Sequence, residues 1–211
     1  MGIELGLAYA LLTLTWILIG RTILGVDALV HTDETVSADL AANRTGRMND
    51  LTALGSMLSD TMVKIIVTAL VAAAVFAVWR RWRDVGVLIL SLVLEASVFI
   101  TVTWVIARAR PDVIRLEESP VDSSFPSGHV AAAAAYGALV VVVAWHTRRW
   151  WLRVGTALVV AMVVAMVAWS RVYRGMHYLS DVTAGMALGI ASIAAVWWII
   201  RRHDPDRSVS R

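Results

Sequence analysis

Ionisable side chains stand at the edges of several apolar segments in this chain of 211 residues. One stretch contains Arg171, His177 and Asp181, another contains His129, and Arg110 closes a third segment. Ionisable groups are costly beside a hydrophobic segment unless they have a function. Two guanidiniums can hold an anion, one imidazole can attack phosphorus, and the other can transfer protons. The set therefore indicates phosphoryl chemistry.

The spacing of His177 and Asp181 predicts how the attacking imidazole is held. The two residues are four apart, so on a helix they share one face. A carboxylate in that place can accept a hydrogen bond from one ring nitrogen and leave the other nitrogen as a nucleophile. The remaining histidines, His31, His146 and His203, lack such neighbours and are expected to be solvated loop residues.

A phosphate-binding role is predicted for Ser127, Gly128 and the two arginines, Arg110 and Arg171. Ser127 and Gly128 precede an apolar run, where a helix N-terminus presents backbone N–H groups that favour an anion. Glycine also lets the backbone approach a phosphate closely. Each arginine can offer a bidentate fork to phosphate oxygens. The other arginines near the same loops are expected to pair with lipid headgroups: Arg21, Arg44, Arg47, Arg115 and Arg174.

The composition indicates a membrane protein. Hydrophobic residues make up 59% of the chain and the mean hydropathy is +0.71. Because a membrane-spanning helix needs about 20 apolar residues, we expect an all-α bundle of six transmembrane helices. They form a single domain over residues 1–211. The predicted spans are Leu5–Leu24, Thr61–Trp79, Val85–Ile106, Val130–Trp145, Val154–Trp169 and Val182–Ile200. The fourth and fifth are short and are expected to extend into their flanks.

The loops predict the orientation of the bundle. Arginines gather after the second span, after the fourth span and in the C-terminal tail, and seven tryptophans lie beside them. By the positive-inside rule these segments are cytoplasmic, so both termini are expected in the cytoplasm and the motif-bearing loops outside. The basic composition then reflects topology, and no nucleic-acid partner is expected. The excess of arginine over lysine, eighteen to one, suggests a bacterial source.

Two further features allow alternative interpretations. The segment Val26–Asp60 has apolar residues spaced among polar ones, which predicts one or two amphipathic helices on the outer interface. Such helices could form a lid over the lipid entrance or a purely structural surface layer. Glu95 falls near the middle of the third span. An acid at that depth either has a function, which is the default expectation, or makes a buried hydrogen bond between helices. Gly185-x-x-x-Gly189 and the alanine run Ala131–Ala135 predict close helix packing.

Three short motifs carry a resemblance to a known family. The sequence contains Arg110-Pro111, then Pro126-Ser127-Gly128-His129, then Ser170-Arg171 followed by His177 and Asp181. Their order and spacing resemble the type 2 phosphatidic acid phosphatase superfamily, whose motifs are K-x6-R-P, P-S-G-H and S-R-x5-H-x3-D. The second and third motifs match at every fixed position. The first departs from the pattern, because Thr103 stands where the family has lysine. The motif region, residues 103–181, covers about a third of the chain.

The resemblance implies an enzyme and a mechanism. His177 would form a phosphohistidine, Asp181 would support its imidazole, and His129 would protonate the leaving oxygen and then activate water. Members of the family work without a metal, so no metal or other cofactor is expected. The implied substrate is a lipid phosphate at the extracytoplasmic face of the plasma membrane. Candidates are a polyprenyl diphosphate, which an outward site in a bacterium favours, phosphatidylglycerol phosphate and phosphatidic acid.

Two other functions stay open from the sequence. A lipid phosphotransferase would use the same intermediate and differ only in the acceptor. A channel or scaffold would keep the fold without the chemistry, and the absence of the motif lysine is its best support. No oligomeric state is predicted.

The absence of the motif lysine at position 103 leads to a specific expectation. Thr103 and Arg110 are seven residues apart, so on a continuous helix they face the same way. Thr103 could then offer the phosphate one hydroxyl hydrogen bond. Arg108 would point elsewhere on that helix, whereas Lys64, at the start of the second span, is predicted to supply the missing cation.

Overall fold

The structure, a computed structural model, describes residues 1–58, 61–118 and 122–203. Over these residues the chain forms nine α-helices and no strand. The helices are α1 (Gly2–Leu24), α2 (Asp27–Ala42), α3 (Gly46–Met57), α4 (Thr61–Trp79), α5 (Trp82–Ile106), α6 (Gly128–Ala135), α7 (Gly137–His146), α8 (Trp150–Tyr173) and α9 (Leu179–Arg202). The predicted all-α class is confirmed.

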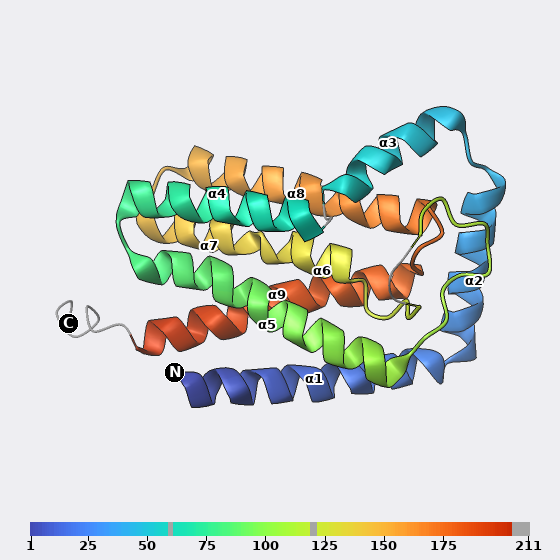
Figure 1. The fold of residues 1–211 in the computed structure, drawn as a ribbon, viewed down its shortest axis with the longest axis horizontal. Coiled ribbons are helices and arrows are strands. Elements are labelled where there is room, and N and C mark those ends of the chain that lie inside the picture. The colour runs from blue at the N-terminus through green and yellow to red at the C-terminus, as the bar shows by residue number, and fades with distance from the viewer. Residues whose placement is uncertain (59–60, 119–121, 204–211) are drawn as a thin grey trace.

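All six predicted spans are present as helices. In the described part of the chain six helical stretches are long and apolar enough to cross a membrane: α1, α4, α5, α6 with α7, α8 and α9. The fourth and fifth spans extend into their flanks, as expected. The six spans lie side by side along the length of the molecule (Figure 1). The start of α1 and the end of α9 meet at one end of the bundle, where His203 Nε2 lies 2.5 Å from Glu4 Oε2. We call this the terminal end. The opposite end, with residues 107–118, 122–127 and 174–178, is the motif end.

The surface of the spans is apolar, as a bilayer requires. Along α1, one face exposes Leu7, Leu11, Leu14 and Leu18, each by more than 60% of its area. Lipid tails are as apolar as these side chains, so helix association must come from close packing rather than from hydrophobic burial. The bundle interior is accordingly built from small residues where helices approach most closely.

The tightest approach joins α6 to α9. A Cβ atom built on Gly185 would lie 2.4 Å from the Ser127 carbonyl oxygen, and one on Gly189 would lie 2.4 Å from the Ala131 carbonyl oxygen. The residues Ala131–Ala135 on the facing side are buried. The predicted close packing of both segments is therefore confirmed, and it fixes the start of α6 against the start of α9.

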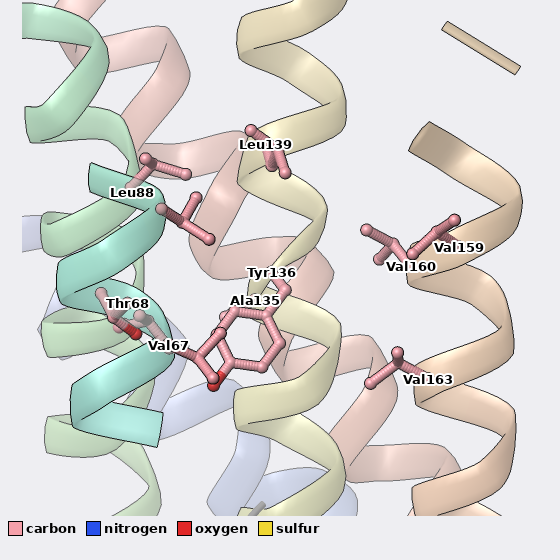
Figure 2. A pocket seen from close by; sticks show the side chains of 11 residues that line it. Val67, Thr68, Leu88, Ala135, Tyr136, Leu139, Val159, Val160 and Val163 are labelled. Carbon is pink, nitrogen blue, oxygen red and sulfur yellow. The ribbon is translucent and has the colours of Figure 1, made fainter. Parts of the chain in front are cut away.

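The fourth span is interrupted at Tyr136. The backbone there makes i→i−3 hydrogen bonds, from Tyr136 N to the Ala133 carbonyl (3.2 Å) and from Leu139 N to the Tyr136 carbonyl (3.0 Å). Beside this break lies a cavity of about 150 Å³ between α4, α5, α6–α7 and α8. Figure 2 shows the Tyr136 ring projecting across it toward Val67 and Thr68 of α4. The other lining side chains are apolar, so the cavity suits hydrocarbon.

The expectation that His146 is a solvated loop residue is wrong. His146 ends α7, and its Nε2 lies 2.7 Å from the Asp84 carboxylate at the start of α5. Its ring stacks on Trp79 at a centroid distance of 4.7 Å. The interaction ties α7 to α4 and α5 at the terminal end. This interaction could not be predicted from local spacing, because the two partners are 62 residues apart in the sequence.

The segment before α4 forms two helices, as predicted, but it docks firmly on the bundle. α2 crosses the motif end, and α3 turns back along α8 (Figure 1). Val36, Leu40 and Leu58 pack against the core between α6 and α8. Leu51 and Leu54 instead stay exposed on α3. Only part of the predicted apolar face is therefore turned toward protein.

Close packing between α6 and α9 makes a direct prediction. Gly189→Ala should destabilise the protein by about 1–3 kcal/mol, because the added methyl overpacks a backbone contact. Gly155→Ala on α8 is the matched control, since a Cβ there meets nothing within 4 Å; it should be neutral or stabilising by about 0.5–1 kcal/mol. Thermal unfolding in detergent measures both. Equal melting temperatures for the two variants would contradict this packing.

Candidate active site

His177 lies in the loop between α8 and α9, at the centre of the motif end. Its side chain is buried, and its Nδ1 donates a hydrogen bond of 2.7 Å to the Ser124 carbonyl oxygen. A carbonyl can only accept, so Nδ1 carries the proton and Nε2 carries the free lone pair. That Nε2 lies 3.5 Å from Arg110 Nη1. This unprotonated nitrogen thus faces a guanidinium group, which can hold a phosphate beside it.

The electrostatic setting keeps His177 neutral. Burial, together with the cations Arg171 and Arg110, lowers the pKa of His177 well below its usual range. This shift favours the neutral imidazole, whose Nε2 keeps its lone pair.

The other motif residues converge on this imidazole. His129 occupies the first turn of α6, and it interacts electrostatically with His177, Arg171 and Arg110. Arg110 follows α5 and also donates to the Met176 carbonyl oxygen, in the residue next to His177. The structure therefore brings two imidazoles and two guanidiniums from three separated motifs into one cluster.

The two motif arginines repel each other. Burial, followed by the charge of Arg171, lowers the pKa of Arg110 to about 10. Two like charges held this close favour an anion between or beside them. The cluster can therefore hold an anion beside the His177 Nε2.

Arg171 is held by groups that the sequence did not indicate. Its Nη1 donates to the Ser56 hydroxyl of α3 (2.5 Å) and to Glu117 (3.1 Å). Arg174 donates to the same Glu117 carboxylate (2.5 Å). Burial raises the pKa of Glu117, but Arg171 and the hydrogen bonds from Ser56 and Arg174 outweigh it and lower the pKa below its usual value. A stable carboxylate thus balances two buried guanidiniums.

The expectation that the arginines flanking the motifs pair with lipid headgroups is wrong for two of them. Arg174 is buried and bound to Glu117. Arg44 donates to the carbonyl oxygens of Tyr173 and Ile114. Both side chains join the outer helices to the loops of the motif end.

The predicted hydrogen bond between His177 and Asp181 is not present. α9 begins at Leu179, so His177 precedes the helix and the two side chains do not share a helical face. Asp181 Oδ2 lies 4.0 Å from His177 Nδ1 and instead accepts from the Tyr178 backbone N–H at 2.9 Å. The imidazole is held by the Ser124 carbonyl, and Asp181 holds the backbone beside it.

The expectation that Thr103 and Arg110 share a helical face is also wrong. α5 ends at Ile106, and Ala107 has a φ of 46°, so the chain turns away before Arg110. The Thr103 hydroxyl is buried and donates to the Phe125 carbonyl oxygen at 3.2 Å. Thr103 therefore supports the segment that leads into Ser127 rather than the predicted phosphate contact.

Ser127 and Gly128 open α6, as predicted. Ser127 N–H donates to the Asp181 carbonyl oxygen (3.0 Å). The buried Ser127 Oγ makes no hydrogen bond within the described chain, which leaves it able to serve a ligand. Packing also requires glycine at position 128, because a Cβ there would lie 2.8 Å from the Phe99 ring.

Lys64 lies close enough to the cluster to act on it. Its charge interacts with His129 and with Glu95. Lys64 and Glu95 both line a cavity of about 360 Å³ between α4, α5 and α6, which also includes Ala132, one turn beyond His129. Glu95 is buried in this cavity within the bundle. The cavity therefore holds a lysine near His129 and an acidic side chain deeper in the bundle.

Comparison with known proteins gives relatives among curated membrane proteins. An undecaprenyl-diphosphatase from Sulfolobus acidocaldarius is 31% identical over 153 residues, covering 70% of this chain and 68% of that protein. The bacitracin transport permease protein BcrC from Bacillus licheniformis is 38% identical over 88 residues. That alignment covers 42% of this chain, and the chain matches only 39% of BcrC.

A solved structure shares the fold. The transmembrane PAP2-type phosphatidylglycerolphosphate phosphatase of Bacillus subtilis superimposes with a TM-score of 0.80 at 22% identity, over 93% of this chain and 98% of that one. The family model described as the PAP2 superfamily matches residues 84–205, which contain all three motifs and the cluster around His177. The chain belongs to the PAP2 superfamily, and it is a multi-pass membrane protein of that family.

Proposed function

We propose that this protein hydrolyses the phosphate or diphosphate group of a membrane lipid through a phosphohistidine at His177. The observation that carries the proposal is the state of that imidazole. Its Nδ1 is bound to a carbonyl, and its Nε2 lies 3.5 Å from Arg110 in a cluster that also contains Arg171 and His129. The names of the relatives support the same class of reaction.

The reaction has two displacement steps. In the first, His177 Nε2 forms a bond to phosphorus while the bond to the leaving oxygen breaks, and His129, protonated beside the bound phosphate anion, gives that oxygen a proton. In the second, His129 takes a proton from water, whose oxygen attacks phosphorus and releases phosphate from His177. Arg110 and Arg171 neutralise the charge on the phosphoryl oxygens. A positioned acid–base group such as His129 contributes roughly 10²–10⁴ in rate.

The substrate is proposed to carry a long apolar chain. The cavity beside Lys64 and the cavity in Figure 2 share the lining residues Thr68 and Leu92, so hydrocarbon space adjoins the phosphate cluster inside the bundle. A polyprenyl diphosphate fits this arrangement. The name of the Sulfolobus relative supports it, whereas the Bacillus subtilis structure favours phosphatidylglycerol phosphate. Phosphatidic acid is the third candidate.

The proposed location is the plasma membrane of a bacterium, with both termini in the cytoplasm and the site outside. The support is the distribution of arginines and tryptophans. Arg80, Arg81, Arg148 and Arg149 adjoin the helix ends at the terminal end of the bundle. Aromatic pairs, such as Trp145 with Trp197 at 4.2 Å, lie at the same end. Both features are typical of a cytoplasmic interface.

The absence of cysteine makes the orientation easy to test. Ser123→Cys and Arg149→Cys place single thiols at opposite ends of the bundle. In intact cells an impermeant maleimide should label the thiol at position 123 and spare the one at position 149 until the membrane is opened. Labelling of position 149 alone in intact cells would reverse the proposed orientation.

Loss of the nucleophile should abolish the covalent intermediate. His177→Ala should remove both turnover and trapping of an acid-labile phosphoenzyme. His129→Ala should slow turnover by roughly 10²–10⁴, with the smallest loss for substrates that have good leaving groups. His31→Ala, on the exposed face of α2, is the matched control and should behave as wild type. Normal phosphate release by His177→Ala would refute the mechanism.

Lys64 should contribute to substrate binding in place of the missing motif lysine. Lys64→Ala should raise KM by about tenfold, the effect expected for losing a charge-assisted hydrogen bond, and Lys64→Arg should restore most of the loss. Steady-state kinetics with a defined lipid diphosphate measure both. An unchanged KM in Lys64→Ala would show that Lys64 interacts with Glu95 and does not bind the substrate.

A further inference from the structure

Arg108 is buried between two carboxylates at the motif end. Its Nη2 donates to Asp33 of α2 at 2.9 Å, and its Nη1 donates to Asp181 of α9 at 2.6 Å. The guanidinium carbon lies 4.2 Å from the centre of the Tyr178 ring. All three charged side chains are less than 10% exposed.

Asp33 extends this network to the start of α9. Its carboxylate accepts from the Ser180 backbone N–H at 3.1 Å and from the Ser180 hydroxyl. Asp181 in turn accepts from the Tyr178 N–H, in the residue that follows His177. A continuous chain of hydrogen bonds therefore runs from α2 through Arg108 to the backbone beside the imidazole.

The charge on Arg108 is permanent in this setting. Burial lowers the pKa of Arg108, but the charges of Asp181 and Asp33 and their hydrogen bonds outweigh it and raise the pKa. An unpaired buried charge is costly, so removing any one member exposes the others to that cost. The three groups must keep their relative positions as a unit.

Arg108 is poorly placed to bind substrate phosphate. Both of its terminal nitrogens already donate to carboxylates, and one face of its guanidinium lies on Tyr178. Arg110, by contrast, has its Nη1 beside the nucleophilic nitrogen of His177. Two arginines in one short loop therefore have different tasks.

We propose that Arg108 and Asp33 are positioning residues of the catalytic centre: they fix the N-terminus of α9, and through it the imidazole of His177, without contacting the substrate phosphate. The proposal rests on the proposed function, and it identifies the task of α2. The helix is a clamp on the catalytic loop, held by a buried ion pair, rather than a lid over the lipid entrance.

Steady-state kinetics should separate positioning from binding. Arg108→Ala and Asp33→Asn should each lower kcat by about 10- to 100-fold, because a misplaced catalytic group is costly in rate. KM and inhibition by inorganic phosphate should change less than about threefold. Arg115→Ala in the same loop and Glu34→Gln on α2 are exposed matched controls and should be silent. The double variant Arg108→Ala/Asp33→Asn should be no slower than the slower single variant.

A second measurement does not depend on turnover. In ¹⁵N-histidine NMR spectra, with the His177 signal assigned by difference from His177→Ala, the wild type should show one tautomer protonated at Nδ1. Arg108→Ala and Asp33→Asn should show a mixture of tautomers or a broadened signal. If Arg108→Ala fails to fold, Arg108→Lys with Asp33→Asn provides the same comparison.

Three results would overturn the proposal. A rise in KM and in the phosphate inhibition constant of about tenfold with kcat intact would make Arg108 a phosphate ligand. A normal kcat with a lowered melting temperature would make the network purely structural. An unchanged His177 signal in both variants would also refute it. Wild-type protein without phosphatase activity would instead refute the proposed function, and the NMR comparison would still decide the positioning role.

Discussion

Buried guanidinium groups set the main constraint on this structure, because each must find an anion where water cannot reach it. The cost of an unpaired buried ion is several kcal/mol. Arg108 avoids this cost by pairing with Asp33 and Asp181, and Arg171 avoids it by pairing with Glu117. These carboxylates come from α2, α9 and the loop before α6. The ion pairs therefore determine where the outer helices dock and how the loops of the motif end are arranged.

These ion pairs also shape the proposed catalytic cluster. Glu117 also binds Ser56 of α3, so α3 becomes a wall of the site. Arg110 is left next to His177 and is crowded by the charge of Arg171. Preorganised cations of this kind stabilise the charge that spreads over phosphoryl oxygens, and they need no reorganisation during the reaction. The close contact between α6 and α9 then fixes the position of His129 relative to the loop that carries His177.

The sequence predicted the parts of this structure that depend on local pattern. Apolar run length located all six spans. The residue types at the edges of those runs, together with the family motifs, selected the residues that meet in the cluster. The two errors about which site residues share a helical face arose where a helix was assumed to continue. Thr103 and Arg110 lie on either side of the end of α5, and His177 precedes α9. The partners that hold the site, Asp33, Ser56 and the Ser124 carbonyl, are more than 50 residues from the groups they bind, and no spacing rule connects them.

The central claim is that a neutral His177, fixed by the Ser124 carbonyl, attacks phosphorus directly. The stereochemistry at phosphorus tests it most directly. Hydrolysis of a lipid substrate made chiral at phosphorus with sulfur and oxygen isotopes would be followed by ³¹P NMR of the released thiophosphate. Two in-line displacements through a phosphohistidine predict net retention of configuration. Net inversion would show a single displacement by water and would contradict the account.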